Sequence, residues 1–556
     1  MPILHPMGKR GIWVRVMAAL ASGLLMAGIF APYDFTALVW VALLPFLAAV
    51  WTLEGKKKAG RGFALGYLSG MVCFLIQLDW LSVVTGAGAI ILPLYLALYW
   101  GVFGAFAATL GNPWGSSRLG ATGIAFSNAA IWGVLEIARG WMLTGFGWNG
   151  LGIGLHDQLP MAQAADLLGV AGLSSLIIFV QAGVILAIGN RKWRPAVLAL
   201  FTVAAMATYG MARIHLEHGH PSKRLTALLV QLNIPQEAGE VLWTAEQVHM
   251  GYEEETLKGL AAHASTPPDW VLWPETALTG RVLTTDDGTS AMWQANNITT
   301  YQVREGSTPF HLIFGAVELE GYEREGELVE KDPIRAYNSL VIQDPDLRLQ
   351  TFRKHHLVIF GETIPFVDSI PLLQKIYEQQ SGTEYGGSFL EGTTLSPLPV
   401  PFGPTSIGVI PTVCFEDTVP RLTRKFIRPG PQIIVNVTND GWFKETQGAE
   451  QHFQNARFRA IELRRPMLRC ANTGVSAAID STGSTRHPDT GMDQILHDGS
   501  GSSFTRGTLL TTLKVPWVPG FSLYACVGDA GLLTVGTLAF FLAVMRRKTK
   551  NVHAAL

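Results

Sequence analysis

Three side chains with reactive groups lie at or near the ends of apolar, β-rich runs between residues 269 and 415. Glu275 comes after VLWP, Lys354 lies within FRKHHLVIFGE, and Cys414 ends the run GVIPTVC. A thiol acts as a nucleophile once it loses its proton, and a carboxylate within hydrogen-bonding reach can take that proton. A lysine ammonium nearby lowers the pKa of the thiol and stabilises a developing oxyanion. Together these residue types indicate nucleophilic catalysis by a thiol.

Each of these residues also has a purely structural interpretation when it is taken alone. A cysteine that ends a buried strand is most often a small core residue. A glutamate after a proline can cap a helix, and a lysine is usually solvated. Glu275, Lys354 and Cys414 are separated by 79 and 60 residues, and this spacing alone does not link them. Only a fold that brings the three together would make them a site.

The surrounding segments predict such a fold, an α/β domain. Short β-rich runs alternate with polar segments, of which 244–264 and 449–465 have the pattern of amphipathic helices. The predicted strands are 225–234, 269–276, 310–319, 336–344, 405–415, 432–440 and 475–480. Because open α/β sheets place their ligands at the carboxyl ends of strands, we expect the three reactive side chains at such an edge.

The rest of the chain is far more apolar. Of the 556 residues, 48% are hydrophobic and only 15% are charged, whereas about 25% is usual for soluble proteins. The mean hydropathy is +0.26. With 16 Trp and 27 Phe, the composition excludes a fibrous or disordered protein. Four cysteines are too few for a disulfide framework.

Eight apolar stretches are long enough to be membrane spans, because about 20 helical residues cross about 30 Å of hydrocarbon. They are 16–33, 35–53, 62–77, 89–110, 119–135, 167–190, 195–212 and 523–545. Basic residues gather at the N-terminus, after the even-numbered spans and at the C-terminus. The positive-inside rule therefore predicts that both termini are cytoplasmic. A cleaved signal peptide in place of the first span would spoil this charge pattern.

The spans and the α/β segment together predict three parts. Residues 1–212 hold seven transmembrane helices, 213–522 form an α/β domain outside the cytoplasm, and 523–556 hold the eighth helix and a cytoplasmic tail. Four charged residues lie in or near the spans: Asp79, Glu136, Arg139 and Asp529. Such charges often have a function, but Glu136 and Arg139 are three residues apart and could also neutralise each other.

The motifs WPET (273–276), FRKHHLVIFGE (352–362) and VCFED (413–417) resemble the Glu, Lys and Cys motifs of the nitrilase, or carbon–nitrogen hydrolase, superfamily. With eight predicted spans, the chain is most similar to the membrane-embedded apolipoprotein N-acyltransferase family. Further matching segments run along nearly the whole chain: LEIARGWMLTGF (135–146), QLNIPQ (231–236) with Trp243, YNS (337–339), TNDGWF (438–443), the block 451–474 and LYACVGD (523–529).

The resemblance implies an extracytoplasmic αββα sandwich beside a helical membrane bundle. It implies Cys414 as the nucleophile, Glu275 as the general base and Lys354 as the residue that stabilises the oxyanion and the thiolate. Supporting residues that it also implies are Glu362 beside the lysine, Glu416, which would orient the nucleophile, the Phe415 N–H as a second oxyanion donor, Trp243 and Asn338.

The implied reaction is ping-pong. Cys414 takes an acyl chain from a phospholipid as a thioester, and the α-amine of the diacylglyceryl-cysteine at the N-terminus of an apolipoprotein then takes it from the enzyme. The protein is expected in the bacterial inner membrane with its catalytic domain in the periplasm, as a monomer without cofactor, metal or nucleic acid. The alternatives are a membrane-tethered amidase that uses water, and a transporter or lipid-binding scaffold with an inactive hydrolase domain.

Several departures and side issues accompany this interpretation. Ile359 stands where the family usually has Pro, and Phe352 and Phe415 replace tyrosines, which puts donor preference or rate in doubt.

The segment 366–377 could be a lid or a packed helix. A disulfide between Cys414 and Cys470 is conceivable, although a buried, inert Cys470 is favoured. Three arginines could meet phospholipid head groups or form ordinary surface pairs: Arg464, Arg465 and Arg469.

Overall fold

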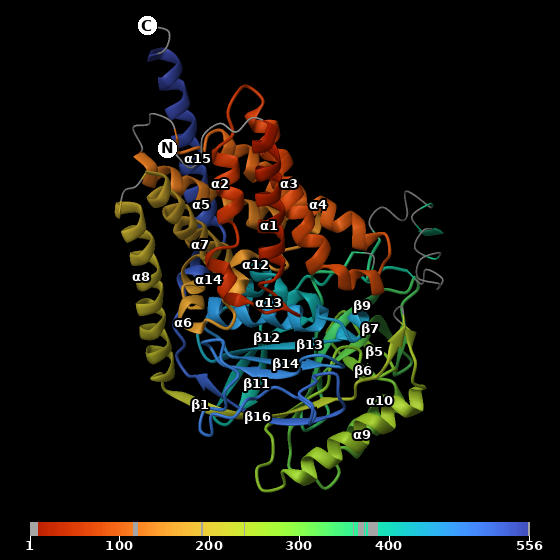
Figure 1. Cartoon of the computed structure of the whole chain (residues 1–556). Coiled ribbons are helices and arrows are strands. Elements are labelled where there is room, and N and C mark those ends of the chain that lie inside the picture. Colours follow the sequence, from red (N-terminus) through yellow and green to blue (C-terminus); the bar gives the residue numbers. More distant parts are fainter. Residues whose placement is uncertain are drawn as a thin grey trace. The chain divides into compact units, whose positions relative to one another are not determined.

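The computed structural model describes residues 9–114, 120–190, 193–237, 240–359, 361–364, 372, 374–375, 378 and 387–553. The chain divides into two compact units (Figure 1). The helical unit comprises Met1–His218 and Phe521–Leu556, and the α/β unit comprises Gly219–Gly520. The two ends of the chain therefore belong to the same unit.

The described part of the helical unit contains helices of very different lengths. They are α1 (Lys9–Ala27), α2 (Leu44–Trp51), α3 (Lys58–Gln77), α4 (Gly88–Ala108), α5 (Gly120–Arg139), α6 (Leu159–Ala162), α7 (Ala165–Asn190), α8 (Trp193–His218), α14 (Leu523–Val527) and α15 (Ala530–His553), with short 3-10 turns η1 (Thr36–Trp40), η2 (Asp79–Val83), η3 (Met142–Thr144) and η4 (Leu151–Leu155). Small residues let α3 and α4 approach closely, because a Cβ on Gly66 would lie 2.1 Å from the Trp100 carbonyl oxygen.

Four helices among the described residues are long and apolar enough to cross a membrane: α3, α4, α7 and α8. The predicted span 35–53 is not one helix, because η1 ends at Trp40 and α2 begins only at Leu44, with a proline in its first turn. The predicted span 523–545 is interrupted at Gly528, whose φ of 58° separates α14 from α15. The structure thus supports several apolar helices, and eight spans stay a prediction.

The α/β unit is built on two main sheets (Figure 1). The larger has the order β10-β9-β7-β4-β1-β16, with β5, β6 and β8 attached beside β7, and the smaller has the order β11-β12-β13-β14-β15. The strands are β1 (Ser222–Gln231), β4 (Trp270–Leu272), β5 (Val282–Thr284), β6 (Ser290–Met292), β7 (His311–Arg324), β8 (Glu327–Glu330), β9 (Ala336–Gln343), β10 (Leu349–Arg353), β11 (Leu398–Phe402), β12 (Thr405–Val413), β13 (Gln432–Thr438), β14 (Met467–Ala471), β15 (Ala477–Ile479) and β16 (Gly507–Pro516), and a separate small ribbon pairs β2 (Gln236–Glu237) with β3 (Glu240–Val241). The predicted α/β fold is confirmed.

The directions of the strands determine which strand ends lie at the same edge of each sheet. In the larger sheet β1, β4 and β7 are parallel, and β10 runs the same way because β9 is antiparallel to both β7 and β10. In the smaller sheet β12, β13 and β14 are parallel. Segments that follow β4, β10, β12 and β13 therefore emerge from carboxyl ends, which is where open α/β sheets bind their ligands.

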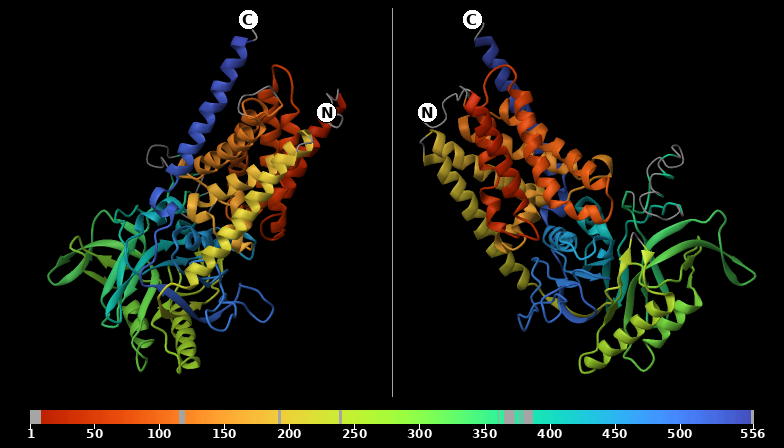
Figure 2. Two further views of the ribbon diagram at one scale, coloured as in Figure 1. Left: turned by 90° about the vertical axis from the view of Figure 1, so that its left-hand side faces the viewer. Right: turned by 45° about the vertical axis from the view of Figure 1, so that its right-hand side comes forward.

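The two sheets pack face to face, and helices cover their outer faces (Figures 1 and 2). The Cys470 thiol on β14 lies 3.5 Å from the Val230 carbonyl oxygen on β1 and 3.3 Å from that of Leu272 on β4. Helices α9 (Ala245–Ala262) and α10 (Gln294–Gln302) lie on the outer face of the larger sheet. Helix α13 (Gly448–Leu463) lies on the opposite side of the two packed sheets. A capping box between Thr244 and Gln247 fixes the start of α9.

Candidate active site

The structure brings Glu275, Lys354 and Cys414 together from three strand ends. Glu275 lies just after β4, Lys354 directly after β10 and Cys414 directly after β12, where the 3-10 turn η5 (Cys414–Thr418) begins. Cys414 is half-buried and has a φ of 53°, in the left-handed region that residues with a side chain seldom adopt. Such strain persists only where neighbouring contacts hold it, and it is typical of active sites.

Glu275 is fixed by both sheets. Its Oε1 accepts a hydrogen bond from Asn338 Nδ2 at 2.7 Å, and its Oε2 accepts one from the Asn439 backbone N–H at 2.9 Å. The Glu275 charge also acts electrostatically on the Cys414 thiol. The segment around Glu275 runs so close to β7 that a Cβ on Gly315 would lie 2.5 Å from the Glu275 Cα. A glycine at this point of β7 is therefore required for the position of the carboxylate.

Lys354 is buried between two carboxylates. Its Nζ lies 2.8 Å from Glu362 Oε2 and 3.8 Å from Glu275 Oε1. Asn338 Nδ2 also donates to Glu362 Oε1 at 2.6 Å, so one amide group links both glutamates. The Val358 N–H donates to Glu362 Oε2 at 2.9 Å. These contacts hold the ammonium beside the site and leave it little freedom.

Burial and charge set the protonation of the three groups. Burial and the Glu275 charge raise the pKa of Cys414 well above its usual value, and the opposite effect of Lys354 is smaller. Burial also raises the pKa of Glu275. Burial by itself would lower the pKa of Lys354, but Glu362 and Glu275 raise it overall. The resting site therefore holds a neutral thiol and an ammonium, and the thiol needs a base to react.

Glu416 connects the lysine loop to the turn of the nucleophile. Its Oε1 accepts the N–H groups of His355 at 2.7 Å and His356 at 2.9 Å, and its Oε2 accepts that of Val413 at 2.9 Å. Burial raises the pKa of Glu416 to about 7, although the three amides favour the carboxylate. The ring of Phe415 stacks on that of His356 with centroids 5.7 Å apart. Glu416 thus orients backbone at both sides of the site.

The other predicted residues lie elsewhere or outside the described part. Trp243 packs against the hydrophobic core around Val248 and Tyr252, near Gly251 of α9. Phe352 is buried, with its ring 5.6 Å from that of Phe426, in an edge-on contact that uses no hydroxyl group. Most of the segment 366–377, interpreted above as a lid or a packed helix, lies outside the described residues.

A buried cluster of four charged side chains lies next to the nucleophile, and sequence reasoning missed it. Arg469 on β14 forms ion pairs with Asp417 and Asp440, the latter at 2.8 Å. His452 on α13 also bridges these carboxylates, with Nε2 2.9 Å from Asp417 and Nδ1 2.8 Å from Asp440. Asn436 joins the cluster to the site, because its Oδ1 accepts from Arg469 at 3.0 Å and its Nδ2 donates to the Cys414 carbonyl oxygen at 3.0 Å.

The cluster favours a charged histidine. Asp440 and Asp417 lie 2.8 Å and 2.9 Å from the two ring nitrogens of His452, and Arg469 Nη2 lies 3.1 Å from Nδ1. Because a carboxylate can only accept hydrogen bonds, the two carboxylates favour the imidazolium form. Burial by itself would lower the pKa of His452, but Asp417 and Asp440 raise it overall. Two cations and two anions then balance inside the fold, as buried charges require.

Burial decides two of the predictions made from the sequence, one about three arginines and one about a disulfide. Arg464, Arg465 and Arg469 are all at most 1% exposed, so they neither contact head groups nor form surface pairs. Cys414 and Cys470 form no disulfide. Burial raises the pKa of the Cys470 thiol to about 12, which makes it inert. Among the described residues, no group of three His, Cys, Asp or Glu side chains is arranged to hold a metal ion.

Comparison with known proteins gives the class first and then the family. The family model of carbon-nitrogen hydrolases matches residues 226–493, which contain the three reactive side chains. The model of the apolipoprotein N-acyltransferase N-terminal domain matches residues 22–183. Among solved structures, a carbon-nitrogen hydrolase from Helicobacter pylori G27 is similar over 52% of this chain and 89% of that chain, with 12% identity and a TM-score of 0.33.

Full-length relatives agree with both matches. The chain is 31% identical over 574 residues to an apolipoprotein N-acyltransferase of Bradyrhizobium diazoefficiens, which covers 97% of this chain and 96% of the relative. A relative of the same name from Geobacter metallireducens is also 31% identical over 574 residues, with the same coverage. The chain belongs to the apolipoprotein N-acyltransferase family. The predicted resemblance and the predicted class of enzyme, an N-acyltransferase, are confirmed.

Proposed function

We propose that Cys414, Glu275 and Lys354 perform lipoprotein N-acylation through a thioester on Cys414. The observation that carries this proposal is the convergence of the three side chains at strand ends, with the buried Lys354 Nζ 3.8 Å from Glu275 Oε1 and Cys414 at the start of η5. A raised pKa makes a carboxylate a stronger base, and a thiol that stays neutral at rest reacts only when its proton can leave to that base. Lys354 supplies positive charge beside both groups.

In the first half-reaction, Glu275 takes the thiol proton as Cys414 Sγ attacks the ester carbonyl carbon of a phospholipid. The tetrahedral oxyanion forms beside the Lys354 ammonium, and the Phe415 N–H is the proposed second donor. The carbon–oxygen bond to the glycerol then breaks. Glu275 returns the proton to that oxygen, so that a lysophospholipid leaves and the acyl thioester remains.

In the second half-reaction, the α-amine of a diacylglyceryl-cysteine attacks the thioester carbonyl. Glu275 takes a proton from the amine, the carbon–sulfur bond breaks, and the thiol is regenerated with that proton. Because water competes with the amine, the thioester must be kept from bulk water. A site that receives both substrates from a bilayer meets this condition.

The proposed setting is the bacterial inner membrane, with eight spans, both termini in the cytoplasm and the α/β unit in the periplasm. Segregation of the basic residues supports this orientation. The four long apolar helices of the described residues, α3, α4, α7 and α8, fit a protein that crosses the membrane several times.

The intact mass of the purified full chain, incubated with phospholipid and no acceptor, tests the proposal. We expect an acyl-sized adduct that hydroxylamine removes, and no adduct on the Cys414→Ala chain. Addition of a diacylglyceryl-cysteine peptide should then clear the adduct and give the N-acyl peptide. Release of fatty acid without acceptor would favour an amidase that uses water. Intact phospholipid without any adduct would contradict phospholipid as the donor.

A further inference from the structure

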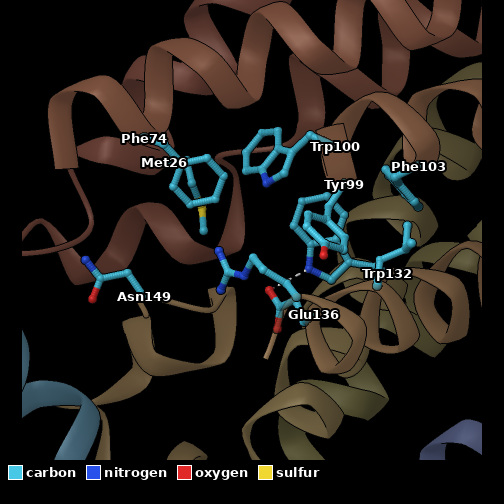
Figure 3. Close-up of a pocket in the computed structure, with 10 residues that line it drawn as sticks. Met26, Phe74, Tyr99, Trp100, Phe103, Trp132, Glu136 and Asn149 are labelled. Atoms are coloured by element: carbon cyan, nitrogen blue, oxygen red, sulfur yellow. Dashed lines mark hydrogen bonds between the residues drawn. The ribbon is translucent and has the colours of Figure 1, made fainter. Parts of the chain in front are cut away.

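A pocket in the helical unit combines aromatic walls with a polar end (Figure 3). It holds about 340 Å³ of empty space, part of which is open at its mouth, and the innermost room is the size of a small polar group. The lining residues come from α1, α3, α4, α5 and the loop that follows α5, and they include Phe74, Tyr99, Trp100, Trp132, Glu136 and Arg139. Neither the catalytic residues nor the α/β unit contribute to this lining.

Arg139 at the end of α5 is buried in this pocket with most of its donors unused. It is only 4% exposed. Among the described residues, its single hydrogen-bond acceptor is the Gly147 carbonyl oxygen, 3.2 Å from Nη2, and its Nε has no partner. The guanidinium also lies 5.3 Å from the centre of the Phe74 ring. A guanidinium offers five N–H donors, so this one can bind an acceptor beyond those that the described residues supply.

Glu136, the nearby carboxylate, is engaged elsewhere. Its Oε1 accepts the Trp132 Nε1–H and the Leu151 backbone N–H, both at 2.9 Å. No ion pair within 4.0 Å joins it to Arg139 among the described residues. Glu136 therefore acts on the Arg139 charge electrostatically, without an ion-pair contact. Among the described residues, the pocket supplies no acceptor for the open donors of Arg139.

We infer that this pocket binds a phosphate oxygen of a phospholipid head group. Guanidinium groups bind phosphate oxygens through parallel N–H bonds, and the small inner space fits one such oxygen while the rest of the head group stays at the mouth. The aromatic side chains Tyr99, Trp100 and Trp132 are residue types that gather where apolar and polar parts of lipids meet.

The surroundings favour a lipid over a dissolved anion as the source of that oxygen. Two of the lining helices, α3 and α4, are among those that can cross a membrane. On α4, Ile90, Ile91, Leu98 and Val102 are exposed, as expected for side chains that face lipid tails. Phosphate groups of lipids are the concentrated anions next to such helices, and basic pockets between transmembrane helices bind head groups. This inference is independent of the proposed thioester chemistry.

Native mass spectrometry of the full chain in detergent tests the site. The Cys414→Ala background prevents acylation, so every lipid adduct is non-covalent. We expect the chain to retain dioleoyl-phosphatidylglycerol more tightly than dioleoylglycerol, which has the same acyl chains and no phosphate. Arg139→Gln should weaken the phospholipid adduct by about tenfold or more and leave dioleoylglycerol binding unchanged.

A matched control is Arg15→Gln, because Arg15 in the same unit donates to the Thr52 side chain and carbonyl oxygen at 3.0 Å and leaves the pocket untouched. It should bind phospholipid like the parent chain. Equal retention in the Arg139→Gln chain would overturn the inference. Displacement of the lipid by millimolar inorganic phosphate would contradict a lipid source. If Arg139→Gln does not fold, the phospholipid and dioleoylglycerol comparison on the parent chain decides, and equal retention there overturns the site.

Discussion

Two buried arginines, one in each unit, have hydrogen-bond partners in opposite degrees. In the α/β unit, Arg469 is fully buried and bonds to two carboxylates, the Asn436 amide and the Val475 carbonyl oxygen. In the helical unit, Arg139 is buried almost as deeply but has one carbonyl acceptor among the described residues. A guanidinium whose donors are all used supports the fold, whereas one whose donors are open is available to a ligand.

The energetic reason for the difference lies in what surrounds each charge. A buried charge without a partner is expensive, so an arginine inside a fold is normally neutralised there. Arg469 meets this requirement within a closed cluster of four ions. Among the described residues Arg139 has no ion pair within 4.0 Å, and Glu136 acts on its charge only from a longer distance. On the inference above, a lipid phosphate supplies the closer partner.

Replacement of each arginine by methionine should separate the two roles most strongly. Arg469→Met leaves Asp417 and Asp440 buried with one cation, and we expect it to lower the free energy of unfolding by about 3–5 kcal/mol. Arg139→Met removes one hydrogen bond, and we expect a loss of about 1 kcal/mol or less in lipid-free detergent. Unfolding of both variants in urea, followed by tryptophan fluorescence, measures the difference. Equal losses would remove the distinction between the two arginines.

His452→Gln should sharpen the comparison through pH. The folded-state pKa of His452 is raised above the usual 6.5, so its contribution is complete below pH 6.5 and is lost as the pH rises through the folded-state pKa. At pH 6 we expect the variant to be less stable by about 1.5–3 kcal/mol, because two charge-assisted hydrogen bonds are lost. Unfolding midpoints of parent and variant, measured from pH 6 to pH 9, should converge at high pH. A gap that stays constant would mean that His452 is neutral.

Asn436→Ala should show whether the cluster also positions the nucleophile. It removes the hydrogen bond to the Cys414 carbonyl oxygen, and we expect a loss of about 1 kcal/mol in stability. The rate of thioester formation should fall further than KM for phospholipid rises, because the strained turn is no longer held. Single-turnover acylation measures this split, and Asn436→Asp, which keeps an acceptor for Arg469 but loses the donor, should slow acylation in the same way. Unchanged acylation in both variants would limit Asn436 to a role in folding.

Trp132→Phe is the mildest test and concerns the helical unit. It removes one of the two donors that hold Glu136 away from Arg139. We expect a loss of about 0.5–1 kcal/mol in stability and weaker phospholipid retention, since a released carboxylate can turn towards the guanidinium. Native mass spectrometry of the Cys414→Ala, Trp132→Phe chain measures the retention. Tighter retention of phospholipid than in the parent chain would show that the Trp132 hydrogen bond does not keep Glu136 away from Arg139.

The sequence predicted features that depend on neighbouring residues better than features that depend on residues far apart in the chain. Apolar runs that end at Glu275 and Cys414 predicted strands and their carboxyl ends, because this pattern is local. The strand before Lys354, β10, was not among the predicted strands. The charged groups around Arg469 are 17 to 52 residues away and lie on other elements, so no local sequence pattern indicated them. The strand β14 was also missed, because its residues follow an amphipathic helix directly and contain a buried arginine.

The helical unit shows the opposite limit. The length and the absence of charge correctly identified apolar segments. These two properties do not show where the backbone changes direction within a segment. Pro45 begins a new helix inside one predicted span, and Gly528 breaks another. Glu136 and Arg139 illustrate the same limit of sequence-based prediction. Their spacing on a helix face permits an ion pair, but Trp132 and Leu151 donate hydrogen bonds to Glu136 instead.

The hydrogen bond from Asn439 on the smaller sheet to Glu275 on the larger sheet has a consequence for biogenesis. Glu275 follows a strand of the larger sheet and Cys414 a strand of the smaller one, so neither sheet alone assembles the pair. A chain whose sheets have not yet docked carries Cys414 without Glu275 beside it. On the proposed mechanism, reactivity towards acyl esters therefore begins only when the two sheets dock.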